Sequence, residues 1–309
     1  MTTLQEHTAS PRVAAVIGLG SMGMGMAVSL RKAGLDVIGV DISTDAVSRF
    51  VQAGGRSASS MADAARQADI VVSVVVNAVQ TENVLFGAGG IADVMRPGSV
   101  FISSATMDPA VARKLASQIE AKGVYYLDAP ISGGAARAAS GELTIMASGT
   151  KAAFSAARPA LDAMAAKVYE LGDAAGAGAA FKMINQLLAG VHIAAACEAV
   201  SLAAKLGLDL DKVYEVITAS AGNSWMFENR IPHVLAGDYT PLSAVDIFVK
   251  DLGIIQDMAR TERYPVPLSA AALQMYLAAS GAGMGRDDDS SLARLYAQLS
   301  GASLPEKTR

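Results

Sequence analysis

The sequence predicts an α/β domain built on a doubly wound parallel sheet, followed by an all-α domain. In the first half, short apolar runs alternate with amphipathic stretches, which is typical of parallel strands joined by helices. A glycine-rich turn follows the first apolar run. After Gly172 the strand-like runs stop and an almost unbroken helical pattern begins. A length of 309 residues is enough for two domains of this kind.

The expected strands are short runs of apolar and β-branched residues. The run 70–76 is nearly continuous in β-branched residues, as expected of a central strand buried on both faces. The helix after the second strand is expected to begin at a Ser43 cap and to stop at Gly54. The strands expected are 13–17, 37–40, 70–76, 100–103, 125–127, 143–147 and 168–171, and the helices between them 24–33, 43–53, 61–67 and 109–122.

The second half is expected to be helical throughout. Its longest helix, 179–205, would extend roughly 40 Å. The sequence therefore divides into a flexible N-terminus (1–12), a sheet domain (13–175) and a helical domain (176–309). The shorter helices expected in the last domain are 211–221, 224–235, 243–261, 270–280 and 290–299.

Composition limits the class of protein. Twenty-five Lys and Arg against 29 Asp and Glu give a formal net charge of −4, which does not favour a nucleic-acid partner. The single cysteine, Cys197, is expected to be a small buried side chain in a reducing compartment. Two uncharged runs, 13–30 and 264–285, reach membrane length, but internal glycines and prolines argue against spans. The polar N-terminus does not resemble a signal peptide, so we expect a cytoplasmic protein without a membrane partner.

The glycine-rich turn matches the pattern G-x-G-x-x-G between an expected strand and an expected helix. The first glycine permits a tight turn, the second lets a pyrophosphate approach the backbone, and the third lets helix and strand pack closely. The N–H groups that begin the helix would then face the phosphate charge. A glycine-rich turn of purely structural origin is the alternative. The residues expected to bind a dinucleotide here are Gly18, Leu19, Gly20, Ser21, Met22 and Gly23.

Asp41 ends the second expected strand, 18 residues after Gly23. A carboxylate at this point accepts hydrogen bonds from the ribose hydroxyls and repels a 2′-phosphate. No arginine follows until Arg49, so the sequence favours NAD over NADP. The alternative is an aspartate on a solvent-exposed loop.

Three polar residues share one face of the long helix. Lys182, Asn185 and Gln186 stand at i, i+3 and i+4, and the same face continues as Ala189, Ile193, Ala196 and Val200. Polar groups in an otherwise core-facing stripe are costly unless they meet a cleft or a ligand. A helix end that emerges into solvent is the alternative. A lysine with a lowered pKa in a site of this kind can act as an acid or base, with Asn185 beside it to hold a hydroxyl.

Other chemistries find little support in the sequence. The three histidines, His7, His192 and His233, do not show metal-ligand spacing, so no metal is expected. No Gly-x-Ser-x-Gly motif suggests a hydrolase.

Four segments together resemble the β-hydroxyacid dehydrogenase family, which includes 3-hydroxyisobutyrate dehydrogenase and tartronate semialdehyde reductase. The resemblance extends over nearly the whole chain, from about residue 13 to residue 299. It implies a Rossmann-type domain, a long interdomain helix and an all-helical substrate and oligomerisation domain. The four segments are Gly18–Gly23, residues 128–134 (Asp-Ala-Pro-Ile-Ser-Gly-Gly), Gly176-Ala177-Gly178 with Lys182 and Asn185, and Lys250-Asp251-Leu252.

The resemblance also implies roles for individual residues. Lys182 would be the catalytic acid or base, and Asn185 would contact the reacting hydroxyl. Ser132, Gly133 and Gly134 would bind the substrate carboxylate. Thr106 and Lys250 would lie near the cofactor, with Asp251 orienting the local structure; an i,i+4 surface pair of Lys250 with Asp246 is the alternative. The family resemblance further implies a homo-oligomer, a dimer or a tetramer.

Within the family, one position departs from the common pattern. The family often has two asparagines after the lysine, whereas the second position here is Gln186, which we expect to touch the substrate. Residues 185–198 and 103–107 are most similar to the L-threonate dehydrogenase subgroup. This similarity implies oxidation of L-threonate to 2-dehydro-L-erythronate with NAD. The alternatives are a 3-hydroxyisobutyrate dehydrogenase, a tartronate semialdehyde reductase, or a non-catalytic dinucleotide-binding regulatory module. Residues 224–227 are expected either to line the substrate site or to pack as a core aromatic cluster.

Overall fold

The structure, a computed structural model, describes residues 12–307 of the chain. The chain forms two compact units, unit 1 (Met1–Lys182) and unit 2 (Met183–Arg309). The division falls within a helix, after Lys182, whereas the sequence-based boundary lies after residue 175. The flexible N-terminus expected over residues 1–12 lies outside the described residues except for Arg12.

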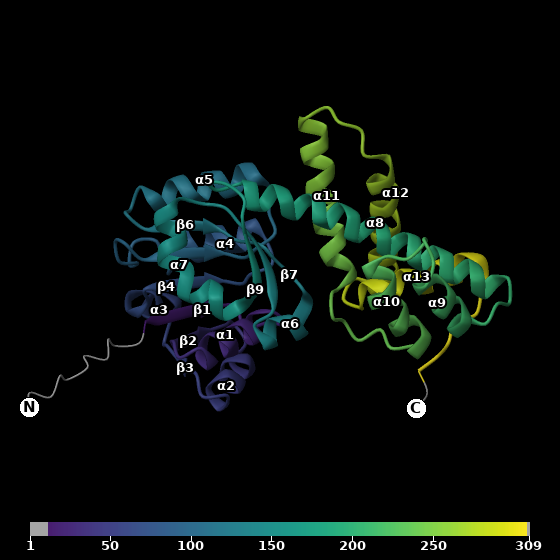
Figure 1. Ribbon diagram of the computed structural model, residues 1–309, viewed down its shortest axis with the longest axis horizontal. Coiled ribbons are helices and arrows are strands. Elements are labelled where there is room, and N and C mark those ends of the chain that lie inside the picture. The colour runs from purple at the N-terminus through teal and green to yellow at the C-terminus, as the bar shows by residue number, and fades with distance from the viewer. Residues whose placement is uncertain (1–11, 308–309) are drawn as a thin grey trace, which may run out of the picture. The chain divides into compact units, whose positions relative to one another are not determined.

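Unit 1 contains a six-stranded parallel sheet (Figure 1). The strand order β3-β2-β1-β4-β5-β6 begins at the centre and winds outward in both directions, which confirms the doubly wound fold. The chain reverses its direction of winding between β1 and β4, and in folds of this kind ligands bind at that point. The strands are β1 (Val13–Ile17), β2 (Asp36–Val40), β3 (Arg56–Ser57), β4 (Ile70–Ser73), β5 (Val100–Ser103) and β6 (Tyr125–Asp128).

Helices cover both faces of this sheet. Successive strand residues point to opposite faces, so that Ala14 and Val16 belong to one buried cluster while Ala15 and Ile17 belong to the other. The first cluster includes side chains from α1, α2 and α7, and the second includes side chains from α3, α4 and α5. The helices are α1 (Gly23–Lys32), α2 (Thr44–Gln52), α3 (Met61–Gln67), α4 (Ala78–Phe86), α5 (Pro109–Glu120), α6 (Gly134–Ser140) and α7 (Lys151–Met164).

Two expected strands of the main sheet belong to a second sheet instead. The runs at 143–147 and 168–171 form β8 (Leu143–Ala147) and β9 (Ala165–Glu170), which pair in parallel. The short β7 (Ile131–Ser132) pairs antiparallel with β8. The helices α4, α6 and α7 were not predicted. The run 70–76 stops at Ser73 because the chain then turns, and Asn77 caps α4 by accepting a hydrogen bond of 2.9 Å from the Gln80 N–H.

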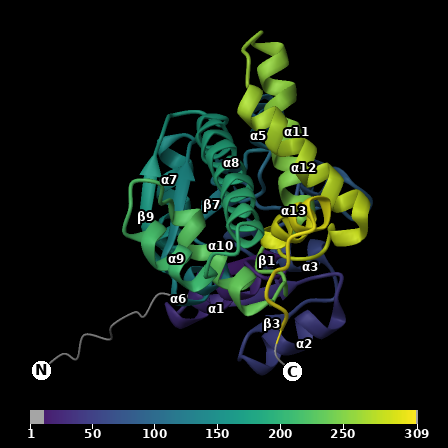
Figure 2. The same cartoon turned by 90° about the vertical axis from the view of Figure 1, so that its right-hand side faces the viewer.

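Unit 2 is helical, as the sequence predicts, and α11 and α12 lie side by side in it (Figure 2). The stripe of α8 that the sequence identified is buried: Ile193, Ala196 and Val200 all contribute to the core of this unit. Cys197 is also buried there, as expected. The elements are α8 (Ala177–Lys205), which begins in unit 1, and α9 (Leu210–Thr218), α10 (Trp225–Ala236), α11 (Val245–Thr261), α12 (Pro267–Ala279), η1 (Ser280–Met284), η2 (Asp289–Ser291) and α13 (Leu292–Ser300).

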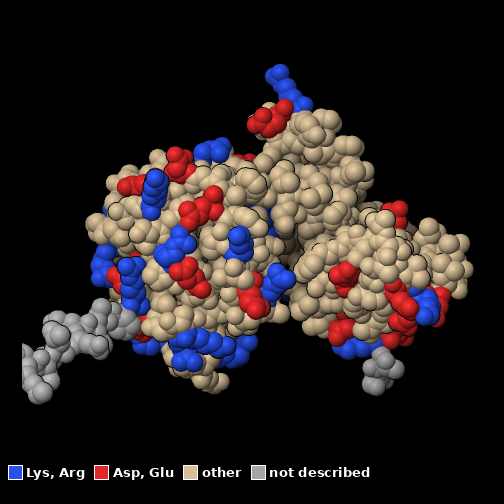
Figure 3. All heavy atoms as spheres, viewed as in Figure 1, with Lys and Arg blue, Asp and Glu red and all other residues tan. Residues whose placement is uncertain are grey.

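The helix α8 is unusually apolar. Among residues 12–307, it is the one helix long and apolar enough to cross a membrane by length and composition alone, and 44% of its most apolar stretch is buried. Beside its buried stripe it exposes Phe181, Ile184, Leu188 and Leu202 by about half. Charged residues of both signs are instead scattered over unit 1 on the face that Figure 3 shows.

A buried ion pair connects α10 to η2 in unit 2. Arg230 binds both carboxylate oxygens of Asp289, with N–O distances of 2.6 and 3.2 Å. Asp289 is completely buried, and this burial raises its pKa to about 6 although the guanidinium acts in the opposite direction. Removal of either partner would leave a charge in the core without compensation.

We therefore expect Arg230→Ala to lower the free energy of unfolding of unit 2 by about 3–5 kcal/mol. Urea unfolding followed by fluorescence of Trp225, the only tryptophan, measures this loss. Arg260→Ala is the control, because Arg260 makes an exposed pair with Asp257 and its loss is expected to cost less than about 1 kcal/mol. Equal effects of the two substitutions would contradict the importance of the buried pair.

Candidate active site

The glycine loop between β1 and α1 uses its glycines for two different reasons. Gly18 has a φ of +95°, and a Cβ there would lie 2.5 Å from the carbonyl oxygen of Val74. A Cβ on Gly23 would overlap the carbonyl of Gly18. At Gly20, in contrast, no heavy atom lies within 4 Å of the Cβ position and φ is not in the left-handed region. Packing therefore requires glycine at 18 and 23, whereas Gly20 leaves open space beside the backbone, which fits the approach of a pyrophosphate.

Asp41 connects the end of β2 to this loop. Its Oδ2 accepts a hydrogen bond of 2.6 Å from the Leu19 N–H, and its Oδ1 accepts one of 2.7 Å from the Ser43 N–H. Each carboxylate oxygen has a second lone pair for another donor. Arg49 pairs with Asp45 on α2 at 3.0 Å. Asp41 is thus part of the hydrogen bonding of the glycine loop, unlike an aspartate that merely faces solvent. The remaining lone pairs of its carboxylate suit ribose hydroxyls.

Asp128, at the end of β6, binds the first turn of α8. Its Oδ2 accepts hydrogen bonds from the N–H groups of Gly176 and Ala179, both at 2.9 Å, and from the Ser148 hydroxyl at 3.3 Å. The side chain is 1% exposed, and burial raises its pKa while these donors favour the charged form. The N-terminus of a helix also favours a negative charge at this position.

The glycines at the start of α8 follow from this contact. Gly176 has a φ of +106°, which favours glycine. A Cβ on Gly178 would overlap the carbonyl of Met146 and lie 2.9 Å from that of Asp128. The Gly-Ala-Gly segment therefore lets α8 begin directly against the strand ends, and this start determines the direction in which Lys182 faces.

Lys182 and Gln186 are buried, each with 8% of its surface exposed, and Asn185 is half-buried. The alternative of a helix end that emerges into solvent is therefore wrong for Lys182 and Gln186. All three residues lie on one face of α8, in keeping with their spacing.

A chain of polar contacts in unit 2 includes two of the expected site residues on α8. Asn185 Nδ2 donates to Gln186 Oε1 at 3.0 Å, and Gln186 Nε2 donates to Asp251 Oδ2 at 2.5 Å. Lys250 Nζ lies 2.6 Å from Asp251 Oδ1. The alternative surface pair of Lys250 with Asp246 does not form in this structure; Asp246 instead accepts a hydrogen bond from Ser280 at 2.6 Å.

The segment expected to bind a carboxylate forms the end of β7 and the start of α6. Gly133 and Gly134 both have positive φ, +134° and +75°, and no heavy atom lies within 4 Å of the Cβ position of Gly134. Ser132 is half-buried beside them. Gly134 thus leaves the backbone accessible at this turn, whereas the Arg137 side chain lies against the Cβ position of Gly133. Thr106 is half-buried in the loop that follows β5.

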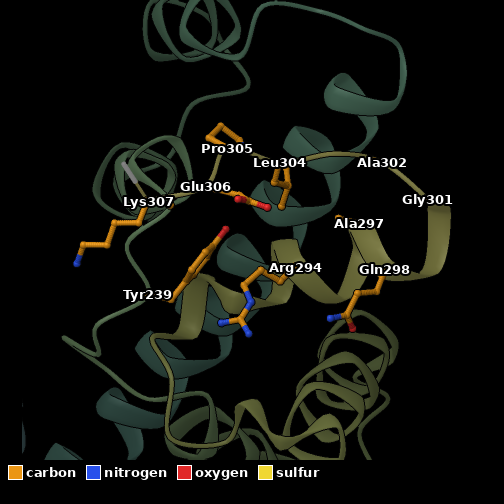
Figure 4. A pocket seen from close by; sticks show the side chains of 11 residues that line it. Tyr239, Arg294, Ala297, Gln298, Gly301, Ala302, Leu304, Pro305, Glu306 and Lys307 are labelled. Carbon is orange, nitrogen blue, oxygen red and sulfur yellow. The ribbon is translucent and has the colours of Figure 1, made fainter. Parts of the chain in front are cut away.

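Several other features lie apart from these contacts. Ser224 caps α10 by accepting a hydrogen bond of 3.0 Å from the Phe227 N–H, and Phe227 is a core residue, whereas Trp225 is exposed. A hollow of about 530 Å³ beside α13 holds the guanidinium of Arg294 over the ring of Tyr239 (Figure 4), and no expected site residue lines it. Within residues 12–307, no group of three or more His, Cys, Asp or Glu side chains is arranged to hold a metal ion.

Comparisons with known proteins assign a family to both parts of the chain. Residues 13–172 match the family described as the NAD binding domain of 6-phosphogluconate dehydrogenase. Residues 176–296 match the family described as NAD-binding of NADP-dependent 3-hydroxyisobutyrate dehydrogenase.

Individual relatives are similar over almost their whole length. The L-threonate dehydrogenase of Cupriavidus necator is 56% identical, with 94% of this chain and 97% of the relative covered. The human mitochondrial 3-hydroxyisobutyrate dehydrogenase is 35% identical, with 93% and 87% covered. A crystal structure from Salmonella typhimurium, described as a 3-hydroxyisobutyrate dehydrogenase, is 50% identical with a TM-score of 0.88 and covers 92% of this chain and 99% of that chain.

The open space beside Gly20 leads to a prediction about cofactor binding. Gly20→Ala is expected to change the free energy of unfolding by less than about 1 kcal/mol, because its Cβ meets no atom, but to weaken NAD binding by about tenfold or more. Calorimetric titration with NAD and thermal unfolding measure the two effects. Gly18→Ala is the matched control and is expected to lose stability because of its positive φ and the Val74 carbonyl. Unchanged NAD affinity in Gly20→Ala would contradict the assignment of this loop.

Proposed function

Because the chain belongs to the β-hydroxyacid dehydrogenase family, which includes 3-hydroxyisobutyrate dehydrogenase, we propose that it oxidises L-threonate to 2-dehydro-L-erythronate with NAD. The observation that supports L-threonate as the substrate is the identity of 48–56% to L-threonate dehydrogenases over at least 94% of the chain. The Salmonella typhimurium structure, described as a 3-hydroxyisobutyrate dehydrogenase at 50% identity, makes that activity the second candidate.

The proposed cofactor site lies at the carboxyl ends of β1 and β2. The loop Gly18–Gly23 would bind the pyrophosphate, Asp41 the adenosine ribose, and Thr106 and Lys250 the nicotinamide side. NAD, when bound, supplies the hydride acceptor, and the protein supplies orientation and proton transfer.

The proposed chemistry uses residues that the chain places on rigid elements. Ser132, Gly133 and Gly134 bind the substrate carboxylate through a hydroxyl and backbone N–H groups, which fixes the acid end. Lys182 takes the proton of the reacting hydroxyl while the carbon loses its hydride, and Asn185 contacts that hydroxyl. Burial of Lys182 supports this role, because it restricts the side chain to few arrangements, and a fixed geometry favours proton transfer.

We also propose that the enzyme is cytoplasmic and forms a homo-oligomer. The exposed apolar side chains of α8, such as Phe181 and Ile184, support burial against another copy. The identity of 48–56% to L-threonate dehydrogenases, together with the presence of Lys182 and Asn185, argues against a non-catalytic module.

The experiment that tests the substrate is an absorbance assay of NADH formation with a panel of hydroxy acids. L-threonate is expected to give a kcat/KM at least about tenfold above that of 3-hydroxyisobutyrate, and NAD is expected to be preferred over NADP because Asp41 repels a 2′-phosphate. Equal rates with 3-hydroxyisobutyrate would favour the second candidate, and faster reduction of NADP would contradict the role of Asp41.

The same assay tests the proposed base. Lys182→Ala is expected to fold, to bind NAD and to lose turnover by about 100-fold or more. Lys205→Ala, in the last turn of the same helix, is the matched control and is expected to keep wild-type turnover. Near-normal turnover in Lys182→Ala would contradict the assignment.

A further inference from the structure

We propose that Gln186 is a positioning residue that fixes the amide of Asn185 in one of its two orientations. The Asp251 carboxylate on α11 determines the orientation of the Gln186 amide, and the Gln186 amide in turn determines that of Asn185. The proposal rests on the proposed function, in which Asn185 contacts the reacting hydroxyl. It also changes the expected role of Gln186, which acts through Asn185 instead of touching the substrate.

Asp251 is the fixed end of the chain of contacts. Its side chain is 1% exposed, and its two oxygens have different partners, Lys250 Nζ at 2.6 Å and Gln186 Nε2 at 2.5 Å. An ionised carboxylate can only accept hydrogen bonds. The group that faces it from Gln186 must therefore be the NH₂ end of the amide.

The amide of Gln186 connects Asp251 to Asn185 through two hydrogen bonds. Its NH₂ end faces Asp251, so its Oε1 faces the other way and accepts the hydrogen bond of 3.0 Å from Asn185 Nδ2. Rotation of the Gln186 amide by half a turn would place its oxygen against an oxygen of Asp251 and its NH₂ group against the NH₂ group of Asn185. Because Gln186 is 8% exposed, water cannot easily replace the lost partners, and this reversed state is costly.

Asn185 is consequently held with its Nδ2 toward Gln186 and its Oδ1 on the other side of the amide plane. Asn185 is half-buried on the face of α8 that also carries Lys182. An asparagine without such a partner can present either its oxygen or its nitrogen to a hydroxyl, whereas this one has a single arrangement. A fixed arrangement is what the orientation of a reacting hydroxyl requires.

Two variants that reverse and then restore the direction of these hydrogen bonds test the proposal. In Asp251→Asn, the introduced amide can turn its oxygen to Lys250 and its NH₂ to Gln186, which then reverses both Gln186 and Asn185. In Gln186→Glu combined with Asp251→Asn, the introduced carboxylate accepts from both sides and returns Asn185 to its original orientation. We expect Asp251→Asn to lower kcat with L-threonate by about 10- to 100-fold, and the double variant to recover at least about tenfold of that loss.

Gln186→Met removes the polar contacts at similar length and is expected to lower kcat by about 10- to 100-fold, with a smaller change in KM. Gln256→Met is the matched control, because Gln256 donates to Ser269 at 3.3 Å outside this network, and it is expected to keep wild-type kcat. Urea unfolding followed by Trp225 fluorescence establishes that each variant is folded.

The proposal is overturned if folded Gln186→Met keeps wild-type kcat, or if the double variant is no more active than Asp251→Asn alone. A second readout does not depend on the substrate: exchange of the Asn185 side-chain NH₂ with solvent, followed by NMR, is expected to be slow in the wild type and at least about tenfold faster in Gln186→Met. Equal exchange rates would also overturn it. If the wild type oxidises no hydroxy acid, the proposed function is wrong, and the exchange measurement still decides whether Gln186 orients Asn185.

Discussion

The contact between the Asp128 carboxylate and the start of α8 is the interaction on which the placement of the proposed site residues of unit 1 depends. Asp128 is buried, and its Oδ2 accepts hydrogen bonds from Gly176, Ala179 and Ser148, which fix both the position and the rotation of the helix. Asp128 also begins the segment that ends in Ser132, Gly133 and Gly134. A single side chain thus connects the proposed carboxylate-binding turn to the helix that carries Lys182.

The second polar contact of this kind, between Gln186 and Asp251, acts on the part of α8 that belongs to unit 2. In both cases a buried aspartate accepts hydrogen bonds from α8 or from the residue before it. The rotation of α8 about its axis is therefore determined by two carboxylates, Asp128 at the end of β6 and Asp251 on α11. Buried carboxylates with several donors resist rearrangement because each broken contact leaves a polar group without a partner. The proposed proton-transfer group and its neighbour Asn185 are therefore held by the protein before a substrate binds.

Local sequence patterns predicted the fold class, most strands and the glycine loop, because these depend on residues close together in the chain. The strand β1, the Ser43 cap of α2 and the helix α3 were predicted within a residue or two. The runs that form β8 and β9 were recognised as strands but assigned to the wrong sheet, since β-branched periodicity does not encode the pairing partner. The short helix α6 was missed because it is rich in alanine and buries only Ala138, so it shows no apolar stripe. The helix α7 was missed although Phe154, Leu161 and Met164 recur at helical spacing, and it contains Pro159, a residue that is unfavourable inside a helix. The sequence did not predict the contacts that Asp128 makes with Gly176 and Asp251 with Gln186, because these partners are 48 and 65 residues away in the chain.

The central claim, that Asp128 holds the start of α8, is tested most directly by hydrogen exchange in Asp128→Ala. The account predicts that amides in the peptide 176–182 exchange at least about tenfold faster than in the wild type, which corresponds to a loss of about 1.4 kcal/mol or more in local stability. Peptides from β1 and α11 should keep their wild-type rates. Unchanged exchange in the peptide 176–182 would contradict the claim.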